Sequence, residues 1–418
     1  MTGAKKPSLV GHTSDQRTRQ TEASAMACCL DVASWRVSTS AEVAAYLDSK
    51  KQQGRGDVLV IRKHLKPVDV YSYLVARFGQ PNGMQNMLRR DSSDNWIHWD
   101  FNLKAQEADV YLAGASREIH IMTSERLLDE EWKCLILAIK ADFRRVGKEK
   151  SAVIHSFEKF AVFQNKFVSI ANLCADLHAA IVDAPPAAPV PRAPEAKEDI
   201  EKIEAALRQI GERGEKLFGD SLKLQLLTPV MAEAFINMVI LTFCKDEIRK
   251  DRQKYEAFVR ETIPTRIDLL TKNCDGFIRS IDTGTEAYAN FMRVVARRNF
   301  ALHGNIDPVR ETLEIVYFDG RRPLFVEPGH HIEKLFEHLE AIHRPGEAAA
   351  EYEHVHIFLA EIVECLDKRR RVFFEQVISD GYPGYELRKS RVTRILLDQV
   401  MMCLLPGMRY DDQLKVTW

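Results

Sequence analysis

A proline-rich segment limits how this chain can fold more than any other stretch. Five of the ten residues from 185 to 194 are prolines. Proline has no backbone N–H and a fixed φ, so such a segment cannot continue a helix or form a central strand. Proline-rich segments are instead extended and semi-rigid. The sequence therefore predicts two modules joined by a Pro/Ala-rich linker over residues 185–197.

The residues before this linker include segments with the hydrophobic spacing of helices and segments with that of strands. Residues 1–27 are polar and predict a disordered tail. Within residues 28–150, residues 57–62 are typical of a buried strand, and residues 67–78 of a helix with proline in its first turn. Residues 96–103 alternate between polar and apolar side chains, as a strand with one exposed face does. These patterns predict a small α+β domain with a mainly antiparallel sheet and a regulatory or sensing role.

Helical patterns dominate the remainder of the chain. Residues 151–184 carry phenylalanines at helical spacing and predict one amphipathic helix. Residues 198–380 predict an all-α bundle, interrupted by a small β-hairpin at residues 313–326. Residues 381–418 predict a C-terminal helical tail. The predicted fold is thus an α+β domain followed by a helical bundle with a hairpin insertion.

Three boundaries inside these helical regions can be compared with a structure. The patterns predict a charged helix over residues 197–218 and a separate, strongly apolar helix over residues 222–249. Another helix spans residues 347–378. The tail helix is predicted over residues 390–405, where the apolar side chains need a surface to bury them.

One helix of the bundle carries a candidate site. Residues 285–302 have apolar side chains at helical spacing, and Gly304 follows as a helix stop. Arg298 and Asn299 therefore lie on the last turn, with His303 at its end. Because Asn299 and His303 are four residues apart, they share one face of the helix.

These side chains suit phosphoryl chemistry without a metal. Histidine gives and takes protons near neutral pH, and arginine presents a planar, charged fork to a phosphate or its transition state. His303 and Arg298 can together promote attack by a ribose 2′-hydroxyl on the neighbouring phosphorus, which leaves 2′,3′-cyclic phosphate and 5′-hydroxyl ends. The alternative is structural, with His303 capping the helix C-terminus and Arg298 solvated at the surface.

The run Arg298-Asn299-Phe300-Ala301-Leu302-His303, followed by Gly304, resembles the signature of HEPN domains. That signature is an Arg, four to six residues and a His, often with a polar residue directly after the Arg. The resemblance covers roughly residues 198–380 and implies a dimeric helical bundle in which the Arg and His of two protomers line one cleft. In HEPN toxins silenced by a nucleotidyltransferase antitoxin, a tyrosine stands two residues after the histidine. This chain has Asn305 there, which argues against that type of control.

The resemblance implies a metal-independent endoribonuclease of a toxin or antiviral defence system, acting as a homodimer on RNA. Arg298 would stabilise the phosphate, His303 would transfer protons, and Asn299 would orient the histidine or the phosphate. The alternative is a non-catalytic HEPN bundle that binds a nucleotide or RNA or serves for dimerisation. A third hypothesis is a structural adaptor that acts through the phenylalanine stripe and the linker. A regulatory partner would bind the N-terminal domain.

The charge balance and the cysteine spacing limit how the chain could bind RNA and whether it could hold a metal ion. The 418 residues include 59 Lys and Arg and 60 Asp and Glu, so any RNA binding must be local rather than spread over a basic surface. None of the 8 cysteines forms a Cys-x-x-Cys pair, and the sequence predicts no zinc site and no cofactor. The polar N-terminus and the lack of a run of about eighteen apolar residues predict a cytoplasmic protein without a membrane segment.

Overall fold

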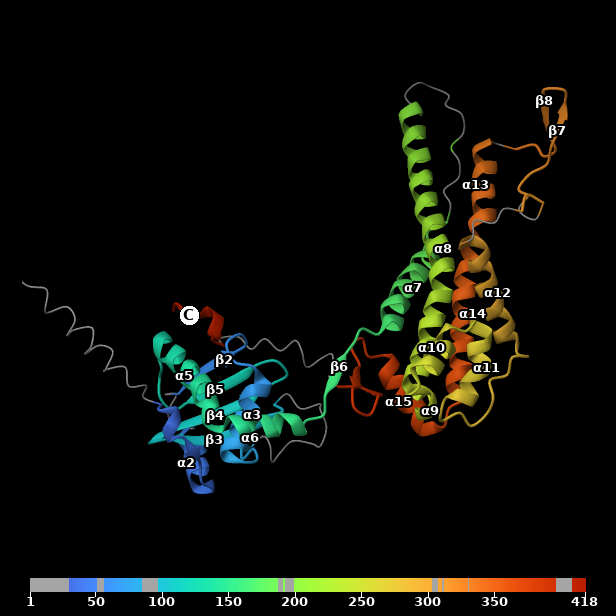
Figure 1. Cartoon of the computed structure of the whole chain (residues 1–418). Coiled ribbons are helices and arrows are strands. Elements are labelled where there is room, and N and C mark those ends of the chain that lie inside the picture. Colours follow the sequence, from blue (N-terminus) through green and yellow to red (C-terminus); the bar gives the residue numbers. More distant parts are fainter. Residues whose placement is uncertain are drawn as a thin grey trace, which may run out of the picture. The chain divides into compact units, whose positions relative to one another are not determined.

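The chain forms two compact units, and the division between them lies at residue 158. Unit 1 consists of Met1–Glu158 together with Leu396–Trp418, and unit 2 is Lys159–Ile395 (Figure 1). Unit 2 is thus inserted between two pieces of unit 1. The computed structural model describes residues 30–50, 56–84, 97–186, 191, 199–302, 307–309, 312–329, 331–395 and 408–418.

A five-stranded sheet forms the centre of unit 1, and its four strand pairings are all antiparallel. The antiparallel sheet that the sequence predicts is therefore confirmed. Because side chains alternate along a strand, Phe101 and Leu103 share one face, whereas Asp100 and Asn102 share the other. The strands in spatial order are β1 (Arg36–Val37), β3 (Trp99–Ala105), β4 (Ala108–Gly114), β5 (Ile119–Thr123) and β2 (Asp57–Ile61).

Helices pack against the apolar side chains of this sheet. Tyr73 and Trp132, each fully buried, belong to the same core as Phe101. The Tyr73 hydroxyl donates to a carboxylate oxygen of Asp142 at 2.6 Å, so its polar end is satisfied at the edge of the core. The helices are α2 (Ser40–Lys50), α3 (Pro67–Phe78), α5 (Asp129–Asp142) and α6 (Gly147–Ser156), with short 3-10 helices η1 (Val32–Ser34) and η2 (Phe143–Val146).

The end of the chain completes unit 1. Within residues 408–418, Tyr410 forms a parallel bridge with Val60 of β2, and the Val60 N–H donates to the Arg409 carbonyl at 2.9 Å. The Arg409 guanidinium lies 3.4 Å from the Asp57 carboxylate. This terminal segment thus extends the edge of the sheet next to β2.

One carboxylate fixes this segment. Asp411 is fully buried, and its oxygens accept backbone N–H bonds from three consecutive residues, Arg62 (3.0 Å), Lys63 (3.2 Å) and His64 (2.9 Å). Burial raises the pKa of Asp411, but these bonds and Nδ1 of His64 at 2.8 Å outweigh it and leave that pKa below its usual value. Trp418 then stacks on the His64 ring, with centroids 3.4 Å apart.

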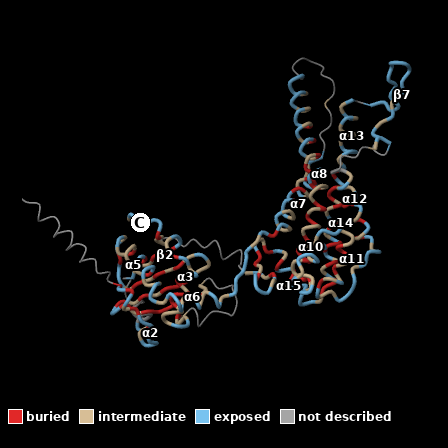
Figure 2. Tube along the Cα trace, in the orientation of Figure 1, coloured by how far each residue is buried: buried red, intermediate tan, exposed pale blue. Residues whose placement is uncertain are grey.

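Unit 2 is built around one long helix, α8 (Asp199–Phe243). Figure 2 shows its second half buried among the other helices and its first half largely exposed. By length and composition alone, Ile200–Phe243 could cross a membrane, and 56% of its apolar window is buried inside the protein. The other helices are α7 (Lys166–Val182), α9 (Asp246–Arg249), α10 (Arg252–Arg260), α11 (Ile263–Asn273), α12 (Glu286–Leu302), α13 (His331–His343), α14 (Pro345–Glu364) and α15 (Lys368–Ile378).

Unit 2 also contains a small sheet, built from segments outside residues 198–380, where the sequence predicts a helix (151–184) and a helical tail (381–418). Within the described residues of 198–380, the prediction of helices with one hairpin is confirmed. β6 (Phe160–Val162), β9 (Gly384–Glu386) and β10 (Arg391–Thr393) form a three-stranded sheet in the order β10-β9-β6. The predicted hairpin is confirmed as β7 (Val316–Asp319) and β8 (Arg322–Phe325). It follows α12 in the chain, and α13 lies beside the first half of α8 (Figure 1).

The predicted boundary at residues 185–197 is also wrong. Cys174 and Leu177 of α7 belong to the same hydrophobic core as Leu224 and Met231 of α8, so the helices on both sides of the proline-rich segment share one core. Residues 187–190 and 192–198 lie outside the described part of the chain. Proline content predicts where regular structure stops, and it does not predict which segments pack together.

Other helix boundaries differ for local reasons. The predicted helix over residues 151–184 is divided, because the Asn165 side chain accepts the Phe167 N–H at 3.1 Å and starts α7 anew. The tail helix predicted at residues 390–405 is wrong at its start, where β10 pairs with β9. Residues 396–407 and the predicted disordered tail, residues 1–27, lie outside the described residues.

Candidate functional site

Helix α12 carries the candidate site at its C-terminal end. Thr285 precedes it and accepts the Tyr288 N–H on its hydroxyl at 3.1 Å, which satisfies an otherwise unpaired donor of the first turn. Phe291 is fully buried and stacks on Phe358 of α14, with centroids 4.8 Å apart. This packing fixes the rotation of the helix, so Arg297, Arg298 and Asn299 follow at defined positions on its last turns.

Arg297 is held by carboxylates of α14. Its guanidinium lies 2.6 Å from Glu351 and 3.1 Å from Glu347. Glu351 is buried, and burial raises its pKa, whereas the charge of Arg297 acts in the opposite direction. The pair therefore joins α12 to α14 and neutralises Arg297. This role was not predicted from the sequence, although two glutamates four residues apart on one helix face are a signal for a cation opposite them.

Arg298 has a different environment. It is half-buried, and its Nη1 donates to the Asn299 side-chain oxygen at 3.0 Å. Its Nε is buried and has no hydrogen-bond partner within the described residues. In that same part of the chain, no carboxylate oxygen lies within 4.0 Å of its guanidinium. Arg298 thus keeps a positive charge that no carboxylate of the described residues neutralises, beside the exposed Asn299.

The third predicted site residue, His303, lies outside the described residues, which stop at Leu302 and resume at Asp307. The structure brings Arg298 and Asn299 into contact with each other. The resemblance implies that Asn299 orients the histidine or the phosphate; in the structure its side-chain oxygen accepts the hydrogen bond from Arg298.

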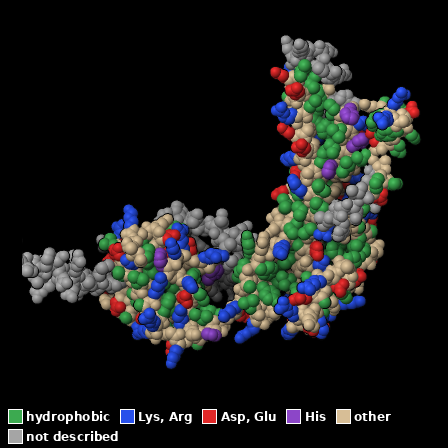
Figure 3. Space-filling model, turned by 45° about the horizontal axis from the view of Figure 1, so that its top comes forward, with side chains coloured by type: hydrophobic (Ala, Val, Ile, Leu, Met, Phe, Trp, Pro, Cys, Tyr) green, Lys and Arg blue, Asp and Glu red, His purple; other side chains and the backbone are tan. Residues whose placement is uncertain are grey.

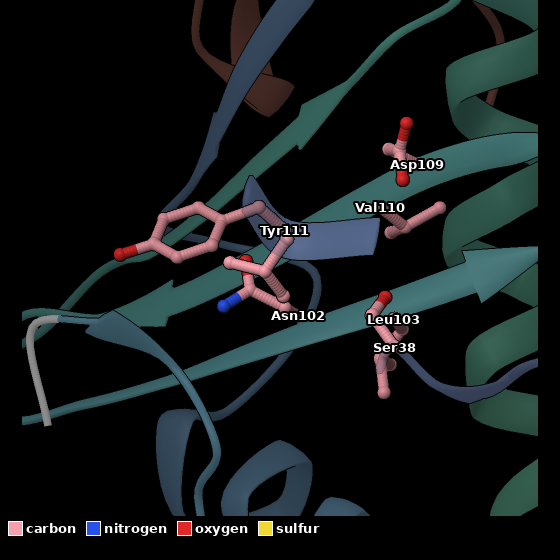
Figure 4. A pocket seen from close by; sticks show the side chains of 7 residues that line it. Ser38, Asn102, Leu103, Asp109, Val110 and Tyr111 are labelled. Atoms are coloured by element: carbon pink, nitrogen blue, oxygen red, sulfur yellow. The ribbon is translucent and has the colours of Figure 1, made fainter. Parts of the chain in front are cut away.

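Unit 1 offers a small pocket between the start of α2 and strands β3 and β4. Figure 4 shows Tyr111 and Asn102 lying together there, as their register on β4 and β3 requires. Beside the pocket, the backbone N–H and carbonyl of Asn102 exchange two hydrogen bonds of 3.0 Å with the side chain of Asn82. The lining residues are Ser38, Val43, Asn102, Leu103, Asp109, Val110 and Tyr111.

Three titratable residues lie on this side of the sheet. His98 lies 3.2 Å from the Ser116 hydroxyl, and the Asp100 carboxylate accepts from the Tyr111 hydroxyl at 3.0 Å. His120 lies 3.6 Å from Glu118, and burial lowers its pKa. Over the described ranges, no group of three or more His, Cys, Asp or Glu side chains is placed to hold a metal ion.

No protein-family model matches the chain, and neither does any curated protein or solved structure. The resemblance to HEPN domains therefore rests on the six-residue motif and its helical surroundings. Within that motif region, the two adjacent arginines of α12 differ most clearly in their surroundings, since one is paired with carboxylates and the other is not.

Proposed function

We propose that unit 2 is a metal-independent endoribonuclease of the HEPN type, with its site at the C-terminal end of α12. The observation that supports this most is the contrast between Arg297 and Arg298. Arg297 is neutralised by Glu347 and Glu351, whereas Arg298 meets no carboxylate among the described residues. A guanidinium whose charge no carboxylate neutralises is able to bind a phosphate.

Each motif residue then has one role. The RNA 2′-oxygen forms a bond to phosphorus while the bond from phosphorus to the 5′-oxygen breaks, and His303 moves the protons. Arg298 stabilises the charge on the non-bridging oxygens. Asn299 holds the Arg298 fork through the 3.0 Å hydrogen bond. Arg297 and Glu351 position the last turns of α12 and do not touch RNA.

We also propose that two copies associate through unit 2. Tyr317, Phe318 and Phe325 of the β7–β8 hairpin are 64%, 67% and 60% exposed, and none of the residues of α13 is buried. Hydrophobic side chains are visible along this part of unit 2 in Figure 3. Pro323 of β8 has no N–H, so the outer edge of β7 is the one better able to pair with a second β7 about a two-fold axis. Sedimentation should show a dimer that Phe318→Ser weakens.

The cleavage proposal is tested with the full chain and mixed cellular RNA in excess EDTA. Wild type should produce 2′,3′-cyclic phosphate and 5′-hydroxyl ends. Arg298→Ala and His303→Ala should each lower the rate by about a hundredfold or more. The matched control is Arg297→Ala, which removes the neighbouring charge but should retain most of the rate at a temperature where the variant is folded.

The possible outcomes separate the hypotheses. Equal losses of cleavage rate in Arg297→Ala and Arg298→Ala would mean that cleavage requires only an intact α12 with positive charge at its end, and not Arg298 in particular. Binding of RNA or a nucleotide without cleavage, weakened by Arg298→Ala, would support a non-catalytic HEPN bundle instead.

We further propose that unit 1 regulates unit 2 and contacts any regulatory partner. Cleavage by the full chain that changes when unit 1 is destabilised alone would support that role.

A further inference from the structure

Two buried cysteines face each other in unit 2 at the ends of two helices. Cys244 directly follows α8, and Cys274 directly follows α11. They form an isolated antiparallel bridge, and they are 3% and 2% exposed. Of the five cysteines in the described part of the chain, these two alone are directly opposed across a backbone bridge.

The backbone hydrogen bonds define the geometry of this pair. The Lys245 N–H donates to the Asn273 carbonyl at 2.9 Å, and the Asp275 N–H donates to the Phe243 carbonyl at 2.8 Å. These bonds flank the two cysteines, which therefore occupy a non-hydrogen-bonded position of an antiparallel pair. At such positions the Cα atoms are about 4.5 Å apart and the side chains project to the same face.

This spacing meets the requirement for a disulfide. A disulfide joins residues whose Cα atoms are roughly 4.4 to 6.8 Å apart and whose side chains point toward one another. We propose that Cys244 and Cys274 are an oxidation site that closes to an intramolecular disulfide. This would tie the end of α8 to the end of α11.

The oxidant we assign is a small-molecule disulfide such as oxidised glutathione. One protein thiolate attacks it, forming a mixed disulfide and releasing one small thiol. The second protein thiolate then attacks the protein sulfur, which forms the Cys244–Cys274 bond and releases the other small thiol. The two cysteines lose two electrons and two protons in total, and the oxidant is reduced to two thiols.

The burial of the two thiols determines when this reaction can occur. Burial raises the pKa of Cys244 and, more strongly, that of Cys274, and the nearby Arg249 opposes this only in part. Arg249 donates from Nη2 to the Cys244 carbonyl at 3.0 Å, so it belongs to the local structure. Because the thiolate is the attacking form, the closed native pair reacts slowly. Oxidation should occur during folding or when the α9–α11 segment opens.

The test uses the full chain, refolded from denaturant in a buffer of reduced and oxidised glutathione. Peptide mapping without reduction should find the segments containing Cys244 and Cys274 linked to each other. The bond closes a loop of about thirty residues, so the melting temperature of unit 2, followed by circular dichroism, should rise by about 5 to 10 °C over the reduced protein.

Matched variants keep the test decisive. Cys244→Ser and Cys274→Ser should each abolish the link and the temperature shift. Cys174→Ser alters a thiol that is equally buried but has no opposed cysteine, and it should keep both. Recovery of the two cysteines only as thiols after refolding, or linked to other cysteines, would overturn the proposal. A shift that persists in Cys244→Ser would overturn it as well.

Discussion

The two units differ in how many segments of the chain build them. Unit 2 is one continuous segment, Lys159–Ile395, whose helices share a single large hydrophobic core. Unit 1 has its own core, but its edge at β2 is completed by residues 408–418, which follow the whole of unit 2 in the sequence. The contacts that hold this segment are mainly polar and aromatic, with a buried carboxylate at their centre. Both units thus have a hydrophobic core, and unit 1 depends in addition on the buried carboxylate of a segment distant in sequence.

This difference can be measured within one molecule. All 5 tryptophans lie in unit 1, so tryptophan fluorescence reports on unit 1 alone. The longest helices lie in unit 2, so far-ultraviolet circular dichroism is dominated by unit 2. Variants at the chain end should move the first signal and leave the second nearly unchanged.

The largest effect is expected for Asp411→Ala. Its removal leaves three backbone N–H groups without their acceptor, which should lower the free energy of unfolding of unit 1 by about 3 kcal/mol. Urea unfolding followed by fluorescence measures this. Asp412→Ala, the adjacent and more exposed carboxylate, is the control and should cost under about 1 kcal/mol. Equal effects of both variants would show that the Asp411 contacts contribute no special stability.

The next effect belongs to unit 2. Arg297→Ala leaves the buried Glu351 without its cation and should lower the free energy of unfolding of unit 2 by about 1 to 2 kcal/mol. Urea unfolding followed by circular dichroism measures this. Arg298→Ala should cost less than about 0.5 kcal/mol, because no ion pair among the described residues is lost. A large loss in Arg298→Ala would contradict the contrast on which the proposed site depends.

A smaller effect is expected at Trp418. Trp418→Ala removes a ring stacked on His64 that is itself 44% exposed, so unit 1 should lose about 1 kcal/mol. Because this change also removes one fluorophore, the control is Trp418→Phe, which retains stacking and should restore most of the stability. Failure of the phenylalanine variant to do so would mean that the indole contacts matter more than the stack.

The smallest change in the stability of unit 1 is expected when the pH is lowered. The pKa of Asp411 is lower in the folded protein than in the unfolded chain, so its contribution is fully present above the unfolded pKa, about 4. It is lost as pH falls through the lower, folded value. Unit 1 should therefore lose stability in acid below about pH 4, by fluorescence-detected unfolding, and Asp411→Asn should lose less over the same range. Identical acid profiles for both proteins would exclude Asp411 as the cause.

Local signals in the sequence were sufficient for much of unit 1. The helix at 67–78 begins at Pro67 and ends before Gly79, as predicted. The apolar run at residues 57–62 located β2, and the alternating side chains of residues 96–103 located β3. In unit 2 the predicted gap between residues 218 and 222 does not exist, because α8 continues through it as one helix. The helix predicted over residues 347–378 is instead divided, since Asp367 caps a new helix by accepting the Arg369 and Arg370 N–H groups.

What the sequence could not provide are contacts between distant residues. No local pattern indicates that Asp411 accepts bonds from residues 62–64, because that depends on how two separate segments meet. For the same reason, the motif identified Arg298 and Asn299 but not the pairing of Arg297 with Glu351. The predicted position of Arg298 and Asn299 on the last turns of a helix is confirmed, and the chemistry assigned to them stays a prediction.

The discontinuous makeup of unit 1 has a consequence for biosynthesis. The ribosome makes most of unit 1 first, then all of Lys159–Ile395, and only afterwards the segment that carries Asp411. At typical translation rates this interval is on the order of ten seconds or longer. During that time the outer edge of β2 lacks its contacts with Arg409 and Tyr410, and unit 2 can finish folding before unit 1. Early arrest of synthesis would therefore release a completed helical unit attached to an unfinished sheet domain, which chaperones and proteases can recognise.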